Sequence, residues 1–166
     1  KENILTGEYI SQFEKAFAEY IGVPYAFSCS SGTAGLMSVL SCLDLKPGDQ
    51  IFLPVYTYEG LPRAIKAAGF QPVYIDIDIK THMMSISEIQ KNISEKTRVI
   101  IATHIFGFPC DIQQIKRIAK EKNIFVIEDC AHAIGTEISA KKAGSFGDAA
   151  FFSFGRETLD SRERIG

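Results

Sequence analysis

Residues 124–133 read Ile124-Phe125-Val126-Ile127-Glu128-Asp129-Cys130-Ala131-His132-Ala133, an uninterrupted apolar run followed by two acids. A short continuous apolar run is typical of a strand that is buried on both faces of a parallel sheet. A helical pattern over residues 112–122 precedes it, with Ile112, Ile115 and Ile118 on one face and Asp111 available as a cap. A helix followed by a buried strand indicates an α/β domain.

The same alternation of apolar runs and helical patterns continues through the rest of the chain. Strands are predicted for residues 25–28, 51–53, 72–75, 99–103, 124–127 and 149–152. Helices are predicted for residues 8–21, 34–43, 60–68, 87–93 and 112–122. Repeated strand–helix units favour a mostly parallel sheet with right-handed connections, so we assign the chain to the α/β fold class.

The 166 residues are 46% apolar and 23% charged, which is the composition of a globular domain and not of a disordered chain. The net charge of -2 leaves no basic surplus, so nucleic acid is not expected as a partner. No apolar run is long enough to cross a membrane. The cysteines, Cys29, Cys42, Cys110 and Cys130, are far apart and form no C-x-x-C pair. Three of them lie within or beside apolar runs, so we expect buried free thiols, no metal site and a cytoplasmic protein.

Ligands of parallel α/β sheets bind beyond the carboxyl ends of the strands, so the loops after the apolar runs are candidate sites. Residues 28–34 carry small hydroxyl side chains and Gly32 between a strand and a helix, a pattern that suits a phosphate group. An ordinary helix cap with a permissive glycine is the alternative for this loop. Tyr56 and Tyr58, after the next strand, can stack on a flat ring or pack at the rim.

Two acids at the end of a buried strand are costly unless a cation meets them. We therefore predict that Asp129 pairs with a protonated ring nitrogen of a ligand, with His132 on the same side. A solvated strand end with a hydrogen-bonded histidine is the alternative. Further along, the glycines of residues 144–147 bracket a turn before the last strand, and Ser153 lies where that strand opens into the loop region.

Six short motifs occur in a defined order along the chain. They are Ser31-Gly32-Thr33-Ala34, Pro54 with Thr57-Tyr58, His104-Ile105-Phe106-Gly107, Glu128-Asp129-Cys130-Ala131-His132-Ala133, Gly144-Ser145-Phe146-Gly147-Asp148-Ala149 and Phe152-Ser153-Phe154. In these motifs the chain resembles the DegT/DnrJ/StrS nucleotide-sugar aminotransferases, which are pyridoxal-phosphate (PLP) enzymes. The resemblance implies a three-layer α/β/α sandwich, the large domain of PLP-transferase fold type I, here incomplete.

The resemblance also implies roles for individual residues. The residues implied to bind PLP are Gly32, Thr33, Ala34, Tyr58, Asp129, His132 and Ser153. Thr33 and Ala34 would bind the phosphate, with a hydroxyl contact from Ser153. Tyr58 would stack on the pyridine ring, and Asp129 would pair with its nitrogen. His132 would lie near the ring, whereas His104 is expected to have a structural role in a turn. The complete enzyme would move an amino group from glutamate to a keto group of a nucleotide-linked deoxysugar, as a homodimer.

One position departs from the family's pattern. The family places its Schiff-base lysine five residues after the serine that matches Ser153, and Thr158 stands there in this chain. A threonine hydroxyl cannot form an imine, so we expect the chain as given to be truncated and inactive, holding PLP without a covalent bond. The expected domains are a partial large domain over residues 1–154 and an atypical charged tail over residues 155–166, without the small C-terminal domain.

Two alternatives stay open. The first is a non-catalytic relative that keeps the cofactor or nucleotide-sugar site and does no transamination. The second is a generic Rossmann-like nucleotide-binding module, although the sequence has no G-x-G-x-x-G fingerprint.

Overall fold

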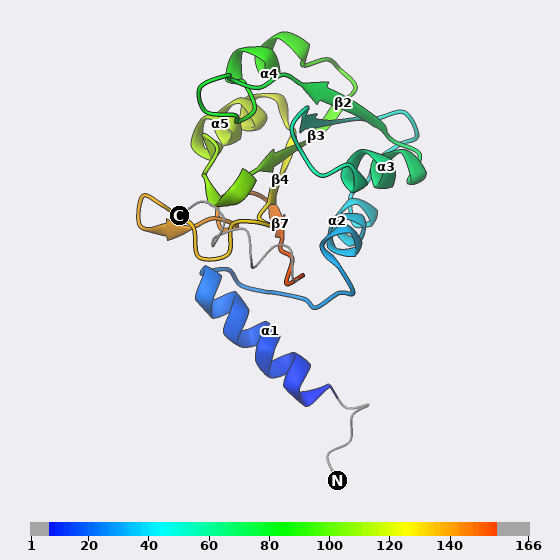
Figure 1. Ribbon diagram of the computed structural model, residues 1–166. Coiled ribbons are helices and arrows are strands. Elements are labelled where there is room, and N and C mark those ends of the chain that lie inside the picture. Colours follow the sequence, from blue (N-terminus) through cyan, green and yellow to red (C-terminus); the bar gives the residue numbers. More distant parts are fainter. Residues whose placement is uncertain (1–6, 156–166) are drawn as a thin grey trace.

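Five parallel strands form the central sheet of the computed structural model, which describes residues 7–155 (Figure 1). Along the chain the elements are α1 (Glu8–Ile21), α2 (Gly32–Ser41), β1 (Gln50–Pro54), α3 (Gly60–Ala67), β2 (Gln71–Ile75), α4 (Ile86–Asn92), β3 (Thr97–Thr103), the 3-10 turn η2 (Ile105–Gly107), α5 (Ile112–Lys122), β4 (Phe125–Asp129), β5 (Glu137–Ile138), β6 (Lys141–Lys142) and β7 (Ala149–Phe151). The strand order is β2-β1-β3-β4-β7, and every neighbouring pair is parallel. The predicted α/β class with a parallel sheet is confirmed.

Successive side chains of the strands point to opposite faces of the sheet and build two separate cores. Ile100 and Val126 pack with buried residues of α4 and α5 on one face. Ile101 and Ile127 pack with buried residues of α2 and α3 on the other face. The strands are therefore buried on both sides, which explains their continuous apolar runs and confirms the three-layer arrangement.

Polar side chains mark where the helices of these layers begin. Ser31 accepts a hydrogen bond from the amide of Ala34, 3.1 Å away, at the start of α2. Asp111 accepts one from the amide of Gln114 at 3.0 Å, as predicted for the start of α5. Each cap satisfies an amide that has no acceptor within its own helix.

The strand predicted for residues 25–28 is not present in the structure. Tyr25 and Phe27 stack on each other and are both exposed. A strand exists only where a neighbour completes its hydrogen bonds, and no strand of residues 7–155 pairs with this segment. An apolar run alone does not report whether that neighbour is present.

Helix α1 lies outside the three layers, beyond the edge at which β7 ends (Figure 1). It is held there by aromatic packing: Phe17 meets Phe152 edge to face, with ring centroids 4.9 Å apart. Phe154 packs edge to face against both Phe13 and Phe17. Among the helices of residues 7–155, none combines the length and apolar character that a membrane crossing requires.

All four cysteines are free, but only two of them are buried. Cys110 and Cys130 lie in the interior, whereas Cys29 and Cys42 are exposed. The prediction of free thiols is confirmed, but the structure buries two of the cysteines where three were expected to be buried. Cys29 lies in the loop before α2 and Cys42 at the carboxyl end of that helix, where neighbouring apolar residues in sequence do not guarantee burial.

Candidate functional site

The carboxyl ends of β4 and β7 meet the amino end of α2 at one edge of the sheet. The amide of Cys130, just after β4, donates to the carbonyl of Phe151 at the end of β7, 2.9 Å away. A Cβ built on Gly32 would lie 3.5 Å from Cβ of Ser153 and 3.4 Å from the carbonyl oxygen of Phe152. The first residues of α2 and Ser153, which are far apart in sequence, therefore lie side by side.

The predicted phosphate-binding residues occupy the first turn of α2. The first amides of a helix have no acceptor within it and carry its positive dipole end, so they favour an anion. The hydroxyl of Ser31 already accepts from the amide of Ala34. The amides of Gly32 and Thr33 precede it in the same turn. An anion at this helix end would thus meet the amides of Gly32 and Thr33 first.

Asp129 ends β4 with a buried carboxyl group that is only 4% exposed. Its position two residues after Ile127 places it on the face of the sheet that carries α2. Oδ1 accepts from the amide of Ala131 at 3.1 Å, and Oδ2 from the hydroxyl of Thr103 at 3.4 Å. Burial raises the pKa of this carboxyl group and outweighs the hydrogen bond from Ala131. The solvated strand end considered above is excluded, and a cation placed here would favour the charged form.

The loop after β1 supplies Tyr58 and a second polar group that the sequence reasoning did not single out. Tyr58 is 65% exposed, with its ring over Gly60 at the start of α3. The structure gives Tyr58 no ring contact with another aromatic side chain of residues 7–155. Oγ1 of Thr57 is buried and has no hydrogen-bond partner among these residues. A buried hydroxyl of this kind calls for a ligand or a water.

His132, in the loop after β4, stacks on Phe106. The two rings are parallel to within 4°, with centroids 5.6 Å apart. Tyr56 meets the same phenyl ring edge to face, with centroids 6.1 Å apart. In the sequence Phe106 stands out only as part of a motif, because the stack depends on a backbone turn that sequence patterns do not encode.

Glu128, next to Asp129 on β4, points to the opposite face of the sheet and is completely buried. Its Oε1 accepts from the amides of Phe146 and Gly147 at 2.8 and 2.6 Å. Its Oε2 pairs with the amide of Gly144 and with Nε2 of His104, both at 2.9 Å. Burial alone would raise the pKa of this carboxyl group, but the hydrogen bonds from His104, Gly147 and Gly144 lower it below its ordinary value. The charge is thus solvated by protein N–H groups in place of water.

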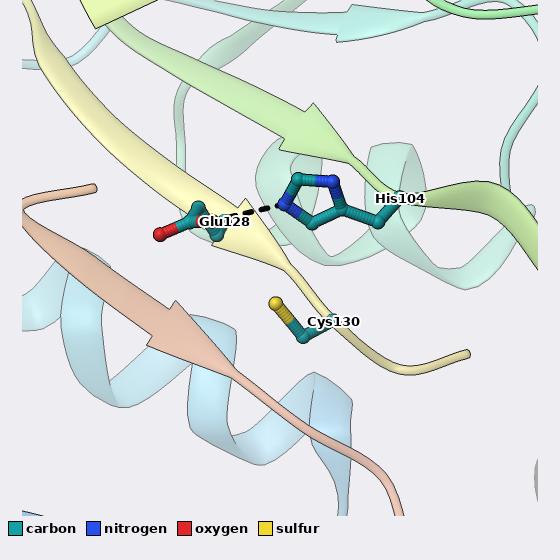
Figure 2. A group of neighbouring side chains, drawn as sticks. All are labelled: His104, Glu128 and Cys130. Atoms are coloured by element: carbon teal, nitrogen blue, oxygen red, sulfur yellow. Dashed lines mark hydrogen bonds and ion pairs between the residues drawn. The ribbon is translucent and has the colours of Figure 1, made fainter. Parts of the chain in front are cut away.

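His104, Glu128 and Cys130 bring a nitrogen, an oxygen and a sulfur within 4.8 Å of one another, a grouping that resembles a metal site (Figure 2). Nδ1 of His104 accepts from the amide of Cys110 at 3.2 Å, so the ring proton is on Nε2, which donates to Glu128. A metal at Nε2 would displace that proton, and moving it to Nδ1 would break the hydrogen bond from the Cys110 amide. Burial also raises the pKa of the Cys130 thiol well above its ordinary value. The cluster is therefore a hydrogen-bonded support, which agrees with the structural role expected of His104.

A groove of about 670 Å³ lies at the opposite, amino-terminal edge of the sheet. Its lining includes Arg98 and Lys116, which pair with Asp49 at 4.0 Å and with Asp148 at 2.5 Å. Parallel α/β sheets bind ligands at the carboxyl ends of their strands. We therefore assign the candidate site to the edge with Asp129 and not to this groove.

Comparisons with known proteins identify relatives from one family of aminotransferases. A model of the DegT/DnrJ/EryC1/StrS aminotransferase family matches residues 1–157, ending one position before Thr158. The GDP-perosamine synthase of Escherichia coli O157:H7 is 43% identical over 158 residues, which are 95% of this chain and 43% of that protein.

Solved structures show the same family relationship. The aminotransferase from Psychrobacter cryohalolentis superposes with a TM-score of 0.88 at 34% identity, over 92% of this chain and 38% of that one. The sugar aminotransferase Spr1654 from Streptococcus pneumoniae, in its PLP-form, gives a TM-score of 0.86 at 29% identity, over 90% and 42%. The chain thus spans less than half the length of the relatives it matches. By its sequence, its fold and the motifs at the carboxyl ends of its strands, this chain belongs to the DegT/DnrJ/EryC1/StrS family of PLP-dependent aminotransferases.

Proposed function

We propose that residues 7–155 form the PLP-binding part of a nucleotide-sugar aminotransferase. The observation that carries the proposal is the environment of Asp129, which is 4% exposed and whose carboxyl group is hydrogen-bonded to an amide and a hydroxyl but to no cation among residues 7–155. A protonated pyridine nitrogen would supply the missing charge. The hydroxyl of Thr57, buried without a partner among the described residues, also fits a site that is completed by a ligand.

The residues around Asp129 fit the rest of the cofactor. The amides of Gly32 and Thr33 and the hydroxyl of Ser153 would hold the phosphate at the amino end of α2. The amide of Ala34 can donate to the phosphate only after it gives up its hydrogen bond to the Ser31 hydroxyl. PLP, when bound, supplies an electron sink for negative charge that develops on the substrate carbon. Keeping its ring nitrogen protonated, as a buried Asp129 carboxylate would, strengthens that property.

Tyr58 and His132 are proposed to face the pyridine ring. The exposed ring of Tyr58 is available to stack, a contact that contributes about 0.5–1.5 kcal/mol beyond its buried area. His132 lies in the loop that begins at Asp129, within range of its charge. These assignments follow the family motifs in which the two residues occur.

The proposed reaction of the complete enzyme is transfer of an amino group from glutamate to a keto group of a nucleotide-linked deoxysugar. A relative named GDP-perosamine synthase supports a nucleotide-linked sugar as the substrate class. We also propose a homodimer, because α1 exposes Tyr9, Ile10 and Phe13, and exposed apolar groups mark interaction surfaces. Four free cysteines accord with the proposed cytoplasmic location.

Thr158, which lies outside the described residues, decides the catalytic part of the proposal. Without a lysine at this position the chain would bind PLP non-covalently and leave glutamate unreacted. The second candidate, a non-catalytic relative that keeps the cofactor site, rests on the same observation.

Equilibrium dialysis of the purified chain against PLP, with pyridoxal as the matched ligand lacking phosphate, tests the site. We expect saturable binding of PLP, at least about tenfold tighter than that of pyridoxal because only PLP reaches the end of α2. Ser153→Ala should weaken PLP binding and leave pyridoxal binding unchanged. Equal affinity for the two ligands, or no binding of PLP, would refute the proposed site.

Incubation with PLP and glutamate tests the catalytic half. No pyridoxamine phosphate should form above the rate of a protein-free control. Its formation at a rate proportional to the chain concentration would show that the chain transaminates without a lysine at position 158, and would end the proposal of inactivity.

A further inference from the structure

The parallel stack of Phe106 on His132 joins two loops at the candidate site. An imidazole in a loop ordinarily samples several ring orientations, and a stacked neighbour restricts them. We propose that Phe106 is a positioning residue, which fixes the plane of the His132 ring and so directs its nitrogen atoms toward the bound cofactor. The inference rests on the proposed function, because it assigns Phe106 a task in that same site.

The backbone at Phe106 is held in a conformation that costs energy. Phe106 has φ +53°, in the left-handed region that bulky residues rarely adopt, and is followed by Gly107 at φ +84°. Such strain, of order 1–3 kcal/mol, persists only where the surroundings enforce it. This turn places the phenyl ring of Phe106 against the imidazole of His132.

Three contacts enforce this turn. The amide of His104 donates to the carbonyl of Asp129 at 3.0 Å, which ties the start of the turn to the end of β4. The hydroxyl of Thr136 donates to the carbonyl of Gly107 at 2.8 Å. A Cβ on Gly107 would lie 3.3 Å from the carbonyl oxygen of His132, so the two backbones approach closely. The turn is therefore fastened to the very segment that carries His132.

Tyr56 limits the movement of Phe106 from another side. Its ring meets the phenyl ring edge to face, so the aromatic contacts of Phe106 extend to the loop that also carries Thr57 and Tyr58. Phe106 itself is 40% exposed, which is more than packing of a core residue would give. The ring contacts of Phe106 are with Tyr56 and His132, one in each of the two loops beside it.

A double-mutant cycle on PLP binding tests the proposal in the whole 166-residue chain. The variants are Phe106→Leu, His132→Ala and the double substitution, with Phe106→Tyr as the conservative replacement. Phe106→Leu should weaken PLP binding about two- to tenfold and shift the absorption maximum of bound PLP. Phe106→Tyr should restore both. In the His132→Ala background, Phe106→Leu should change the affinity by less than about twofold, since its partner is gone.

Thermal melting of each variant establishes that it is folded, and Phe106→Met replaces Phe106→Leu should the latter unfold. The same loss of affinity from Phe106→Leu with and without His132 would overturn the inference while leaving the PLP site intact. Failure of the unsubstituted chain to bind PLP is a separate result, which overturns the proposed function and this inference with it.

Discussion

Glu128 and Asp129 are adjacent in the chain and both are buried, yet their carboxyl pKa values shift in opposite directions. Glu128 faces three backbone amides and the ring N–H of His104. Within the described part of the chain, the carboxyl group of Asp129 accepts only from one amide and one hydroxyl. The first residue is therefore a charged structural anchor, and the second is a carboxyl group whose charge calls for a ligand.

Replacing Glu128 with Gln should destabilise the protein strongly. Whichever way the amide is oriented, its NH₂ group faces two N–H donors that Glu128 accepted from. We expect the free energy of unfolding to fall by on the order of 3 kcal/mol, measured by urea denaturation at pH 7. The matched control is Glu59→Gln, which removes an exposed pair with Arg63 and should change stability by no more than about 0.5 kcal/mol.

The pH dependence of this loss follows from the lowered pKa of Glu128. Its charge stabilises the fold above the unfolded-state pKa of about 4.3, and that contribution is lost as the pH falls through the lower folded-state pKa. The difference in the free energy of unfolding between the unsubstituted chain and Glu128→Gln should therefore decrease as the pH is lowered. A gap that stays constant down to pH about 3 would contradict the assignment.

Asp129→Asn should have the opposite effect on the ligand-free chain. The raised pKa means that Asp129 favours the fold below its unfolded-state pKa of about 3.9, and this contribution disappears as the pH rises through the folded-state pKa. At pH 7 the variant should therefore melt at a higher temperature and bind PLP at least about tenfold more weakly. Asp44→Asn, at an exposed position, should change neither quantity. A lower melting temperature for Asp129→Asn would show that its charge is already compensated.

At the scale of the element, the amino end of α2 has two possible caps. Ser31 caps it in the described state through the amide of Ala34. A phosphate at the same helix end would compete for that amide and could take over its role. The helix is therefore stabilised by its own side chain until a ligand arrives.

Ser31→Ala tests this exchange of caps. Without ligand, the variant should lose about 1 kcal/mol of stability, the usual effect of removing an N-cap. With saturating PLP, the difference from the unsubstituted chain should shrink, because the phosphate then accepts from the freed amide. Differential scanning fluorimetry measures the difference in melting temperature between the two chains, once without PLP and once with it. An equal gap under the two conditions would place the phosphate away from α2.

At the scale of the whole molecule, the sequence predicted what local patterns determine. Apolar runs identified the five strands of the sheet, and Asp111 identified the start of α5. Residues 25–28 were wrongly predicted as a strand, since pairing depends on a distant neighbour. Local pattern thus determines the elements, whereas their partners are set by the tertiary structure.

The candidate site could likewise be predicted only in part from the sequence. Asp129 could be singled out because an acid at the end of an apolar run is chemically unusual wherever it occurs. The role of Glu128 could not, because its partners come from His104, 24 residues earlier, and from a turn at least 16 residues later. The stack of Phe106 on His132 depends on a strained turn that no periodicity reveals.

The four hydrogen bonds at Glu128 join β4, the segment after β3 and the turn before β7 through one carboxylate. Segments fastened to a common point open together, as a single cooperative unit. The amides of Gly144, Phe146 and Gly147 would then share one opening free energy in hydrogen exchange, despite lying in a turn, where protection is ordinarily weak. Assembly of this edge would accordingly be all or none.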